Sequence, residues 1–206
     1  ITYSTSHPNN MTDDLIELHG TNSKLMSCLH LPVQSGSNKI LKLMNRKHTR
    51  EFYFEIIDKL RKHKSNIALS SDFIVGFPGE NDKDFQDTMD LIHHVGFMNS
   101  YSFKYSPRPG TPAADREQIP LKIQDDRLKI MQTTLDQQQI DFNKKFLSKK
   151  LDVLISSSGK YKGQVKGKSE FNQSVAIPGN PNIIGDIVPV QITDISVHSL
   201  IGKAEV

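Results

Sequence analysis

Apolar residues in the first two thirds of the chain follow two alternating periodicities. Four stretches have the apolar-rich or alternating pattern of strands, at 1–6, 29–33, 67–75 and 101–105. Apolar residues at three- and four-residue spacing predict helices after Thr12 and at 40–44, 50–63, 82–95 and 121–146. This alternation predicts the α/β class, with a mainly parallel sheet that is either open or closed into a barrel.

The pattern changes after the long helix. Five short β-type runs follow, separated by Gly, Asn and Pro: LDVLI, GQVKG, QSVAI, DIVPVQITDI and LIGKAEV. Such runs predict a small all-β barrel or sandwich of about five strands. We place the boundary near Lys144, which divides the chain into a domain at 1–143 and a β-domain at 144–206.

The predicted parallel strands are not apolar on both faces. Side chains alternate along a strand, so each strand can be divided by parity. We expect one face, which includes Phe73, Tyr101 and Phe103, to pack against helices. The opposite face carries His30, Gln34, Ser70, Asp72, Ile74, Gly76, Ser102 and Lys104. A largely polar face predicts a cavity for a polar ligand, unless these groups satisfy one another or a bulge breaks the parity.

Composition narrows the class of protein. The 206 residues are 36% hydrophobic and 24% charged, as in globular proteins, and no apolar run is long enough for a membrane span. A single cysteine, Cys28, excludes an intrachain disulfide and a multi-cysteine metal site, and it fits a reducing cytoplasm. The chain starts at Ile1 without an initiator Met, so we expect a piece of a longer protein, or else a processed product.

Four motifs stand at the predicted strand ends, where β/α folds bind ligands. They are TSHP at 5–8, PVQSGS at 32–37, DFIVGFPGE at 72–80 and SPRPGTPAA at 106–114. In this order they resemble the radical S-adenosylmethionine methylthiotransferases, and the last 60 or so residues resemble the TRAM domain, an OB-like RNA-binding β-barrel. The resemblance implies the C-terminal part of a radical-SAM β/α barrel, partial and TIM-like, followed by a TRAM domain.

The resemblance also implies an activity. Arg108 in the last motif and the TSHP motif point to the tRNA enzyme that methylthiolates C2 of N6-isopentenyladenosine beside the anticodon. The threonylcarbamoyladenosine enzyme is the closest alternative. Family members use S-adenosylmethionine and two [4Fe-4S] clusters, one of which generates a 5′-deoxyadenosyl radical. The CxxxCxxC motif that ligates this cluster is absent here, so we expect no metal ligands in this chain.

Candidate cofactor contacts follow from the motifs and the parity. They are Gln34, Ser35, Gly36, Asp72, Ile74, Gly76, Glu80 and Lys104. Two alternatives stay open: Asp72 and Lys104 can form a buried ion pair, and Glu80 can favour the start of the following helix. No catalytic residue is assigned.

Candidate RNA contacts are basic. They are Arg108, Lys160, Lys162, Lys166 and Lys168. The four lysines have even numbers, so a continuous strand would place them on one side, whereas a turn at Gly163 would break this parity. The alternative is a solvated edge that lysines protect from pairing.

The resemblance implies the tRNA anticodon stem-loop and a missing N-terminal part of the same protein as partners, with no membrane contact and a monomeric full-length protein. Two other function classes remain. One is a non-catalytic RNA-binding module. The other is an unrelated β/α enzyme such as an aldolase, but the predicted lumen offers no lysine in an apolar setting and no phosphate-binding Gly-rich loop.

Overall fold

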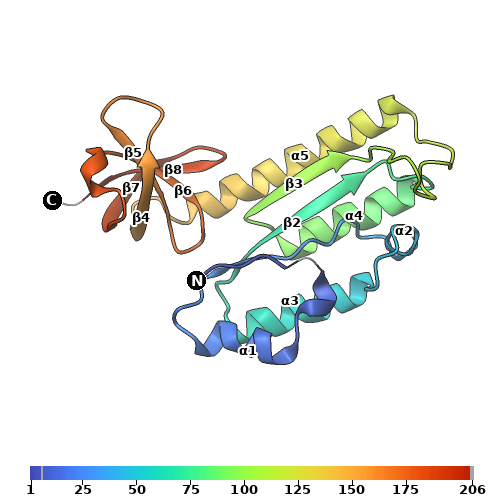
Figure 1. The fold of residues 1–206 in the computed structure, drawn as a ribbon, viewed down its shortest axis with the longest axis horizontal. Coiled ribbons are helices and arrows are strands. Elements are labelled where there is room, and N and C mark those ends of the chain that lie inside the picture. The colour runs from blue at the N-terminus through green and yellow to red at the C-terminus, as the bar shows by residue number, and fades with distance from the viewer. Residues whose placement is uncertain (6, 205–206) are drawn as a thin grey trace.

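The computed structural model describes residues 1–5 and 7–204, which form two lobes joined by a long helix (Figure 1). The first lobe contains a three-stranded parallel sheet, and the second is a closed β-barrel. The helices are η1 (Pro8–Asn10), α1 (Asp13–Thr21), α2 (Asn38–Leu43), α3 (Arg50–His63), α4 (Asp82–Val95), α5 (Leu121–Lys144) and η2 (Pro181–Ile183). The strands are β1 (Cys28–His30), β2 (Ala68–Val75), β3 (Asn99–Lys104), β4 (Lys150–Ser158), β5 (Gln164–Lys168), β6 (Ser174–Pro178), β7 (Ile187–Ile195) and β8 (Ser199–Ala204).

The parallel sheet has the order β1-β2-β3, so β3 is its edge strand. The strand predicted at 1–6 is not formed within the described residues. Only Ser4 makes a single parallel bridge to His30, and Ser6 lies outside the described part. The chain leaves the sheet here because Pro8 starts η1, which replaces the extended backbone.

Local sequence signals set the bounds of the two helices that cover the sheet. The Thr49 side chain accepts from the amide of Phe52 at the start of α3. Asn81 and Asp84 form a capping box at the start of α4, which ends at Gly96 in the left-handed conformation. Both helices have the predicted bounds, at 50–63 and 82–95.

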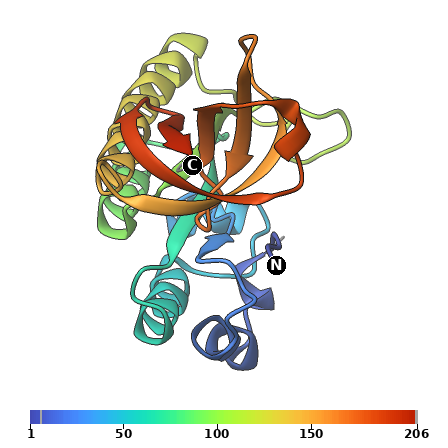
Figure 2. The same cartoon turned by 90° about the vertical axis from the view of Figure 1, so that its left-hand side faces the viewer.

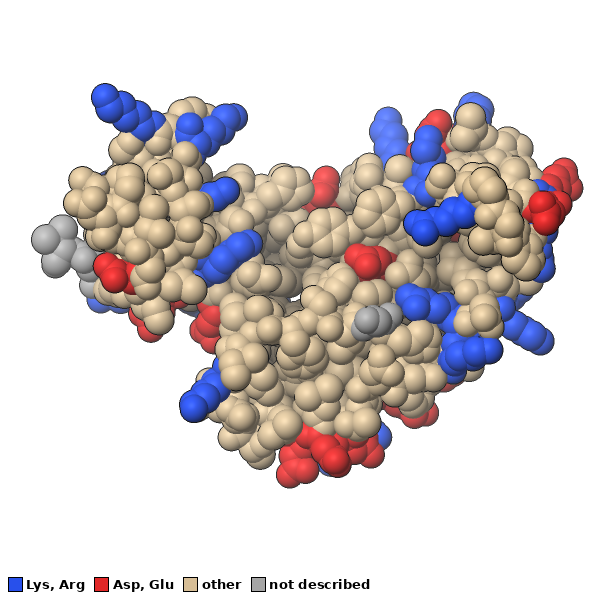
Figure 3. Space-filling model, in the orientation of Figure 1, with Lys and Arg blue, Asp and Glu red and all other residues tan. Residues whose placement is uncertain are grey.

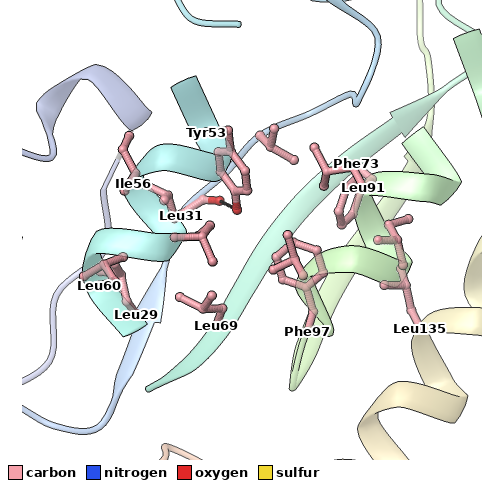
Figure 4. Close-up of a cluster of buried hydrophobic side chains, with 14 of the residues drawn as sticks. Leu29, Leu31, Tyr53, Ile56, Leu60, Leu69, Phe73, Leu91, Phe97 and Leu135 are labelled. Carbon is pink, nitrogen blue, oxygen red and sulfur yellow. Dashed lines mark hydrogen bonds between the residues drawn. The ribbon is translucent and has the colours of Figure 1, made fainter. Parts of the chain in front are cut away.

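The apolar faces of these helices meet one face of the sheet (Figure 4). Leu29 and Leu31 approach Tyr53 and Leu60, and Phe73 lies against Phe97 with ring centroids 5.4 Å apart. Tyr53 is fully buried, and its hydroxyl donates to the Leu31 carbonyl. Burial of such side chains is the main stabilising contribution to this lobe. Figure 2 shows α4 (green) and α5 (yellow) together on one side of the sheet.

The predicted orientation of β3 is wrong. Tyr101 pairs with Asp72 and Phe103 with Ile74, and paired residues of parallel strands point to the same face. Their aromatic side chains are therefore on the face opposite the helices, and they are 56% and 55% exposed. Lys104 pairs with Val75, on the helix side. The register with β2 decides these faces, and it overrides the preference of aromatic residues for burial.

The second lobe is a closed barrel of five strands in the order β4-β5-β6-β8-β7, which confirms the predicted small β-domain. Its interior contains alternate residues of each strand: Val153, Ile155, Val165, Val175, Ile177, Val190, Ile192 and Leu200. Gly167 lets β5 approach β4 closely, because a Cβ atom there would lie 2.3 Å from the Leu154 carbonyl oxygen. Closure leaves no open edge in this lobe.

The β-barrel is docked against the N-terminal ends of the parallel strands. Cys28, Ala68 and Met98 stand at or just before the starts of β1, β2 and β3, and they belong to the apolar cluster of the barrel. In Figure 1 the arrowheads of β2 and β3 accordingly point away from the barrel. The two ends of the sheet thus differ: one is covered by the barrel, and the other carries the sequence motifs.

Candidate functional site

The C-terminal ends of β1 and β2 are tied together by Gln34. Its amide donates to the Asp72 carbonyl at 2.9 Å, and its carbonyl accepts from the Ile74 amide at 3.0 Å. The backbone φ of Gln34 is 74°, which a non-glycine residue adopts only at some energetic cost. The structure thus brings together three of the predicted cofactor contacts, Gln34, Asp72 and Ile74, and places Gly76 just beyond them.

A polar network lies beside these residues on the open face of the sheet. His30 Nδ1 is 2.9 Å from the Ser70 hydroxyl, and His30 Nε2 is 3.5 Å from an Asp72 carboxylate oxygen. The side chain of Asp72 is 28% exposed and can still accept hydrogen bonds from a ligand. Arg46 is close enough to Asp72 for charge attraction, while its burial lowers the pKa of the guanidinium. Arg46 follows α2 in a segment without any periodic pattern, so no sequence signal pointed to it.

Ser35 and Gly36 are engaged in packing against α4. The Ser35 hydroxyl is 3.2 Å from the Thr88 hydroxyl, and the Gly36 amide donates to the same Thr88 oxygen at 2.9 Å. A Cβ atom at position 36 would lie 2.4 Å from the Asp87 carbonyl oxygen. Glycine is therefore needed here for the close approach of two backbones.

Glu80 connects the end of β2 with α5. Its Oε1 atom accepts from the Gly76 amide at 3.0 Å and from Arg127 Nη1 at 2.7 Å. Arg127 also donates to Asp82 at 2.7 Å. Burial raises the pKa of the Glu80 carboxyl, and the Gly76 amide and Arg127 oppose this shift. Glu80 thus fixes the Gly76 turn, where φ is 71° and a Cβ atom would meet the Gln124 side chain at 2.5 Å.

Lys104, the last residue of β3, and Arg108, in the loop after it, are both exposed. Lys104 pairs with Asp125 of α5 at 2.6 Å, and not with Asp72. Arg108 is exposed in the loop between β3 and α5.

The candidate RNA-binding lysines divide into two groups. Lys166 and Lys168 are exposed on the outer face of β5, and they alternate with the buried residues Val165 and Gly167. Lys160 and Lys162 lie in the loop between β4 and β5, where Gly163 has a φ of 77° and interrupts the strand. This loop and the 179–181 segment border a shallow hollow of about 710 Å³. Figure 3 shows basic side chains along the upper edge of the barrel lobe and on its side toward the centre.

The described residues contain no group of three or more His, Cys, Asp or Glu placed to hold a metal ion. Cys28 is buried, and burial raises the pKa of its thiol, so the reactive thiolate is disfavoured. No helix within 1–5 and 7–204 is long and apolar enough to cross a membrane.

Comparisons with known proteins agree with this architecture. Residues 1–92 match the Radical SAM superfamily, and residues 144–204 match the TRAM domain. The chain is also similar in fold to coproporphyrinogen III oxidase (HemN) from Escherichia coli, a Radical SAM enzyme. The TM-score is 0.54 and the sequence identity 13%, over 94% of this chain and 49% of that one.

Sequence relatives are much closer. The chain is 57% identical over 204 residues to the tRNA-2-methylthio-N(6)-dimethylallyladenosine synthases of Rickettsia akari (strain Hartford) and Rickettsia prowazekii (strain Madrid E). The matches cover 98% of this chain and 46% of each relative, so the chain spans slightly less than half of their length. Over almost its whole length the chain is therefore similar to these tRNA methylthio synthases, with a Radical SAM match in its first part and a TRAM match in its last.

Proposed function

We propose that the protein methylthiolates tRNA by radical S-adenosylmethionine chemistry, at C2 of an N6-isopentenyladenosine beside the anticodon. The observation that carries this proposal is 57% identity over 98% of the chain to synthases named for that product. The TRAM match supports it, because a domain of this kind fits an RNA substrate. The proposal concerns the whole protein, of whose relatives this chain spans 46%.

The residues at the strand ends fit the cofactor. The Asp72 carboxylate and the Gln34 side chain offer hydrogen bonds to hydroxyl and amine groups, and half-buried Ile74 offers an apolar contact. S-adenosylmethionine supplies the radical chemistry and the methyl group when it is bound there. In this proposal Asp72, oriented by His30, positions the cofactor, and Glu80 and Arg127 hold the Gly76 turn in place.

The described residues do not fit an iron–sulfur cluster, which takes at least three thiolates. We propose that both [4Fe-4S] clusters are bound by another part of the same protein. Cys28 packs in the apolar junction between the lobes. The composition of the chain fits a cytoplasmic enzyme.

The experiment uses the whole protein with tRNA from cells that lack the modification. After reaction, nuclease digestion and mass spectrometry should detect 2-methylthio-N6-isopentenyladenosine. A product formed only on threonylcarbamoyladenosine tRNA would replace the proposed substrate with its closest alternative. Binding of tRNA without any methylthiolated nucleoside, in a protein whose clusters are spectroscopically intact, would reduce the function to RNA binding.

A matched pair of variants tests the cofactor face. Asp72→Asn keeps the volume of the side chain and removes its charge, so the affinity for S-adenosylmethionine should fall in calorimetry. Asp125→Asn changes a carboxylate on α5, on the helix side, and should bind like the wild type. Equal affinities for both variants would reject this placement of the cofactor.

A further inference from the structure

Tyr101 and Phe103 are two large aromatic side chains that the fold leaves exposed. Both lie on the open face of the edge strand β3, at 56% and 55% exposure, and no intramolecular aromatic partner is present for either among the described residues. The other aromatic side chain on this strand end, Tyr105, packs edge-on against Phe77 at 4.8 Å. Tyr101 and Phe103 are therefore exposed because of the face on which they lie, whereas the nearby Tyr105 has an aromatic partner.

The two rings lie between two regions that the proposed reaction must connect. The TRAM barrel covers the N-terminal ends of the strands, and the cofactor residues stand at the C-terminal ends. From Ala68 to Gly76 the sheet extends for about 26 Å at roughly 3.3 Å per residue. An RNA substrate that contacts both regions has to cross this distance along the open face. Figure 3 shows that the surface there carries few charged side chains and is hollowed between the lobes.

Tyr101 is the ring nearer to the barrel. At the edge of the sheet it lines a cleft of about 400 Å³ between β3, α5 and the barrel, together with Asn99, Gln139, Lys168 and His198. These side chains offer hydrogen-bond donors and acceptors and one cation, although Asp136 adds a negative charge at the rim. Lys168 is held toward the cleft by the Asn172 carbonyl and the Ser174 hydroxyl, each at 3.2 Å. The composition suits the sugar, base edge and phosphate of a nucleotide better than an apolar protein segment.

Phe103 is the ring nearer to the cofactor end of the sheet. It pairs with Ile74, whose amide donates to the Gln34 carbonyl at the cofactor end of the sheet. Residues 101 and 103 are two apart on one strand, so their rings project from the same face about 7 Å apart along it. That spacing allows two nucleotides to stack in succession, with each ring serving as a platform that reads no sequence.

We infer that the open face of β3 is a binding track for unpaired nucleotides of the RNA substrate, with bases stacked on Tyr101 and Phe103 and the strand entering through the cleft at Lys168. This inference rests on the proposed function and names the route by which the RNA passes from the TRAM domain to the cofactor. The track recognises single-stranded loop nucleotides, because bases in a duplex are not free to stack on a side chain.

The test measures binding of an RNA stem-loop to the whole protein, with 2-aminopurine placed at successive loop positions. Loop positions that stack on the rings should lose fluorescence on binding, whereas 2-aminopurine in the stem should not. The double variant Tyr101→Ala with Phe103→Ala removes two stacking platforms, so it should bind the stem-loop at least about 30-fold more weakly and abolish the quenching. Its salt dependence should stay as in the wild type, since no phosphate contact is removed.

Two controls keep the result specific. Tyr101→Phe keeps the ring and should bind like the wild type, whereas Ile130→Ala removes an apolar side chain of similar exposure from α5 and should change nothing. A double variant with a lowered melting temperature but wild-type affinity would show that another protein segment covers the rings, which overturns the inference. Failure of the wild-type protein to bind any RNA would instead overturn the proposed function.

Discussion

At the scale of single residues, the burial of His48 changes the pH at which its side chain gains a proton. His48 is buried, and its ring meets that of His7 edge-on, with centroids 4.8 Å apart. Burial, followed by the nearby charges of His7 and Arg46, lowers the pKa of His48 to about 4. The pKa of His7 is lowered for the same first reason. His48 is therefore neutral in the folded protein under ordinary conditions.

The depressed pKa predicts a loss of stability in mild acid. In the unfolded chain His48 gains its proton near pH 6.5, but in the folded protein only near pH 4. The stabilising contribution is thus complete above about pH 6.5 and is lost as the pH falls toward 4, to a total of about 3 kcal/mol. Thermal unfolding of wild type and His48→Gln across this range should show a shallower decline for the variant. Parallel pH profiles for both would contradict the prediction, and the exposed His198→Gln serves as a control.

At the scale of single elements, β5 has one face in the barrel core and one face in solvent. Its alternate residues Val165 and Gly167 point inward, and Lys166 and Lys168 point outward. The strand begins only after Gly163. The alternation of side chains along β5 therefore does not extend to Lys160 and Lys162 in the preceding loop. Both loop lysines are exposed, and Lys160 Nζ lies 5.7 Å from the centroid of the Tyr161 ring.

We predict that the outward lysines of β5 contact phosphate. Lys166→Glu with Lys168→Glu should lower tRNA affinity and flatten its dependence on salt by roughly one unit per lost contact. The matched control is Lys83→Glu with Lys122→Glu, two exposed lysines on α4 and α5. A second pair, Lys160→Glu with Lys162→Glu, reports on the loop alone. If the β5 pair binds tRNA with the wild-type salt slope, that face is only solvated.

At the scale of the whole molecule, the relative position of the two lobes depends on the last turns of α5. Asn143 is 2% exposed, and its amide donates to the carbonyls of Ser196 and Val197 at 3.1 and 3.0 Å. Its carbonyl accepts from Gln173 at 2.7 Å. The rings of Phe142, Phe146 and Phe171 close the same junction, with centroids 5.1 to 5.8 Å apart.

Loss of Asn143 should loosen the barrel from the sheet. Asn143→Ala leaves the Gln173 amide and two carbonyls without partners, which should cost about 2–4 kcal/mol. Calorimetry should show a lowered transition, or its division into two as the lobes unfold separately. Gln137→Ala, an exposed change on the same helix, provides the control. A single unfolding transition at the wild-type temperature would show that the aromatic rings alone maintain the junction.

Much of the architecture could be predicted from local sequence signals. The bounds of α3 and α4 follow from apolar spacing together with Thr49, Asn81 and Gly96 at their ends. The five β-type runs after α5 each correspond to a strand, because alternation and turn residues act over a few positions. The strand-end motifs also indicated the end of the sheet at which Gln34, Asp72 and Ile74 meet.

Other features were decided only by the tertiary structure, since they depend on partners far away in the sequence. The face on which Tyr101 and Phe103 lie follows from the register with β2, and aromatic character alone predicts the opposite. Glu80 and Ser35 belong to packing networks through Arg127 and Thr88, which are 47 and 53 residues away. The amino-acid sequence by itself determined where most helices and strands form, because apolar spacing, helix caps and turn residues act over a few positions, although the strand predicted at 1–6 did not form within the described residues. The tertiary structure decided which faces become buried and where the barrel docks, because both depend on the packing of the two apolar cores.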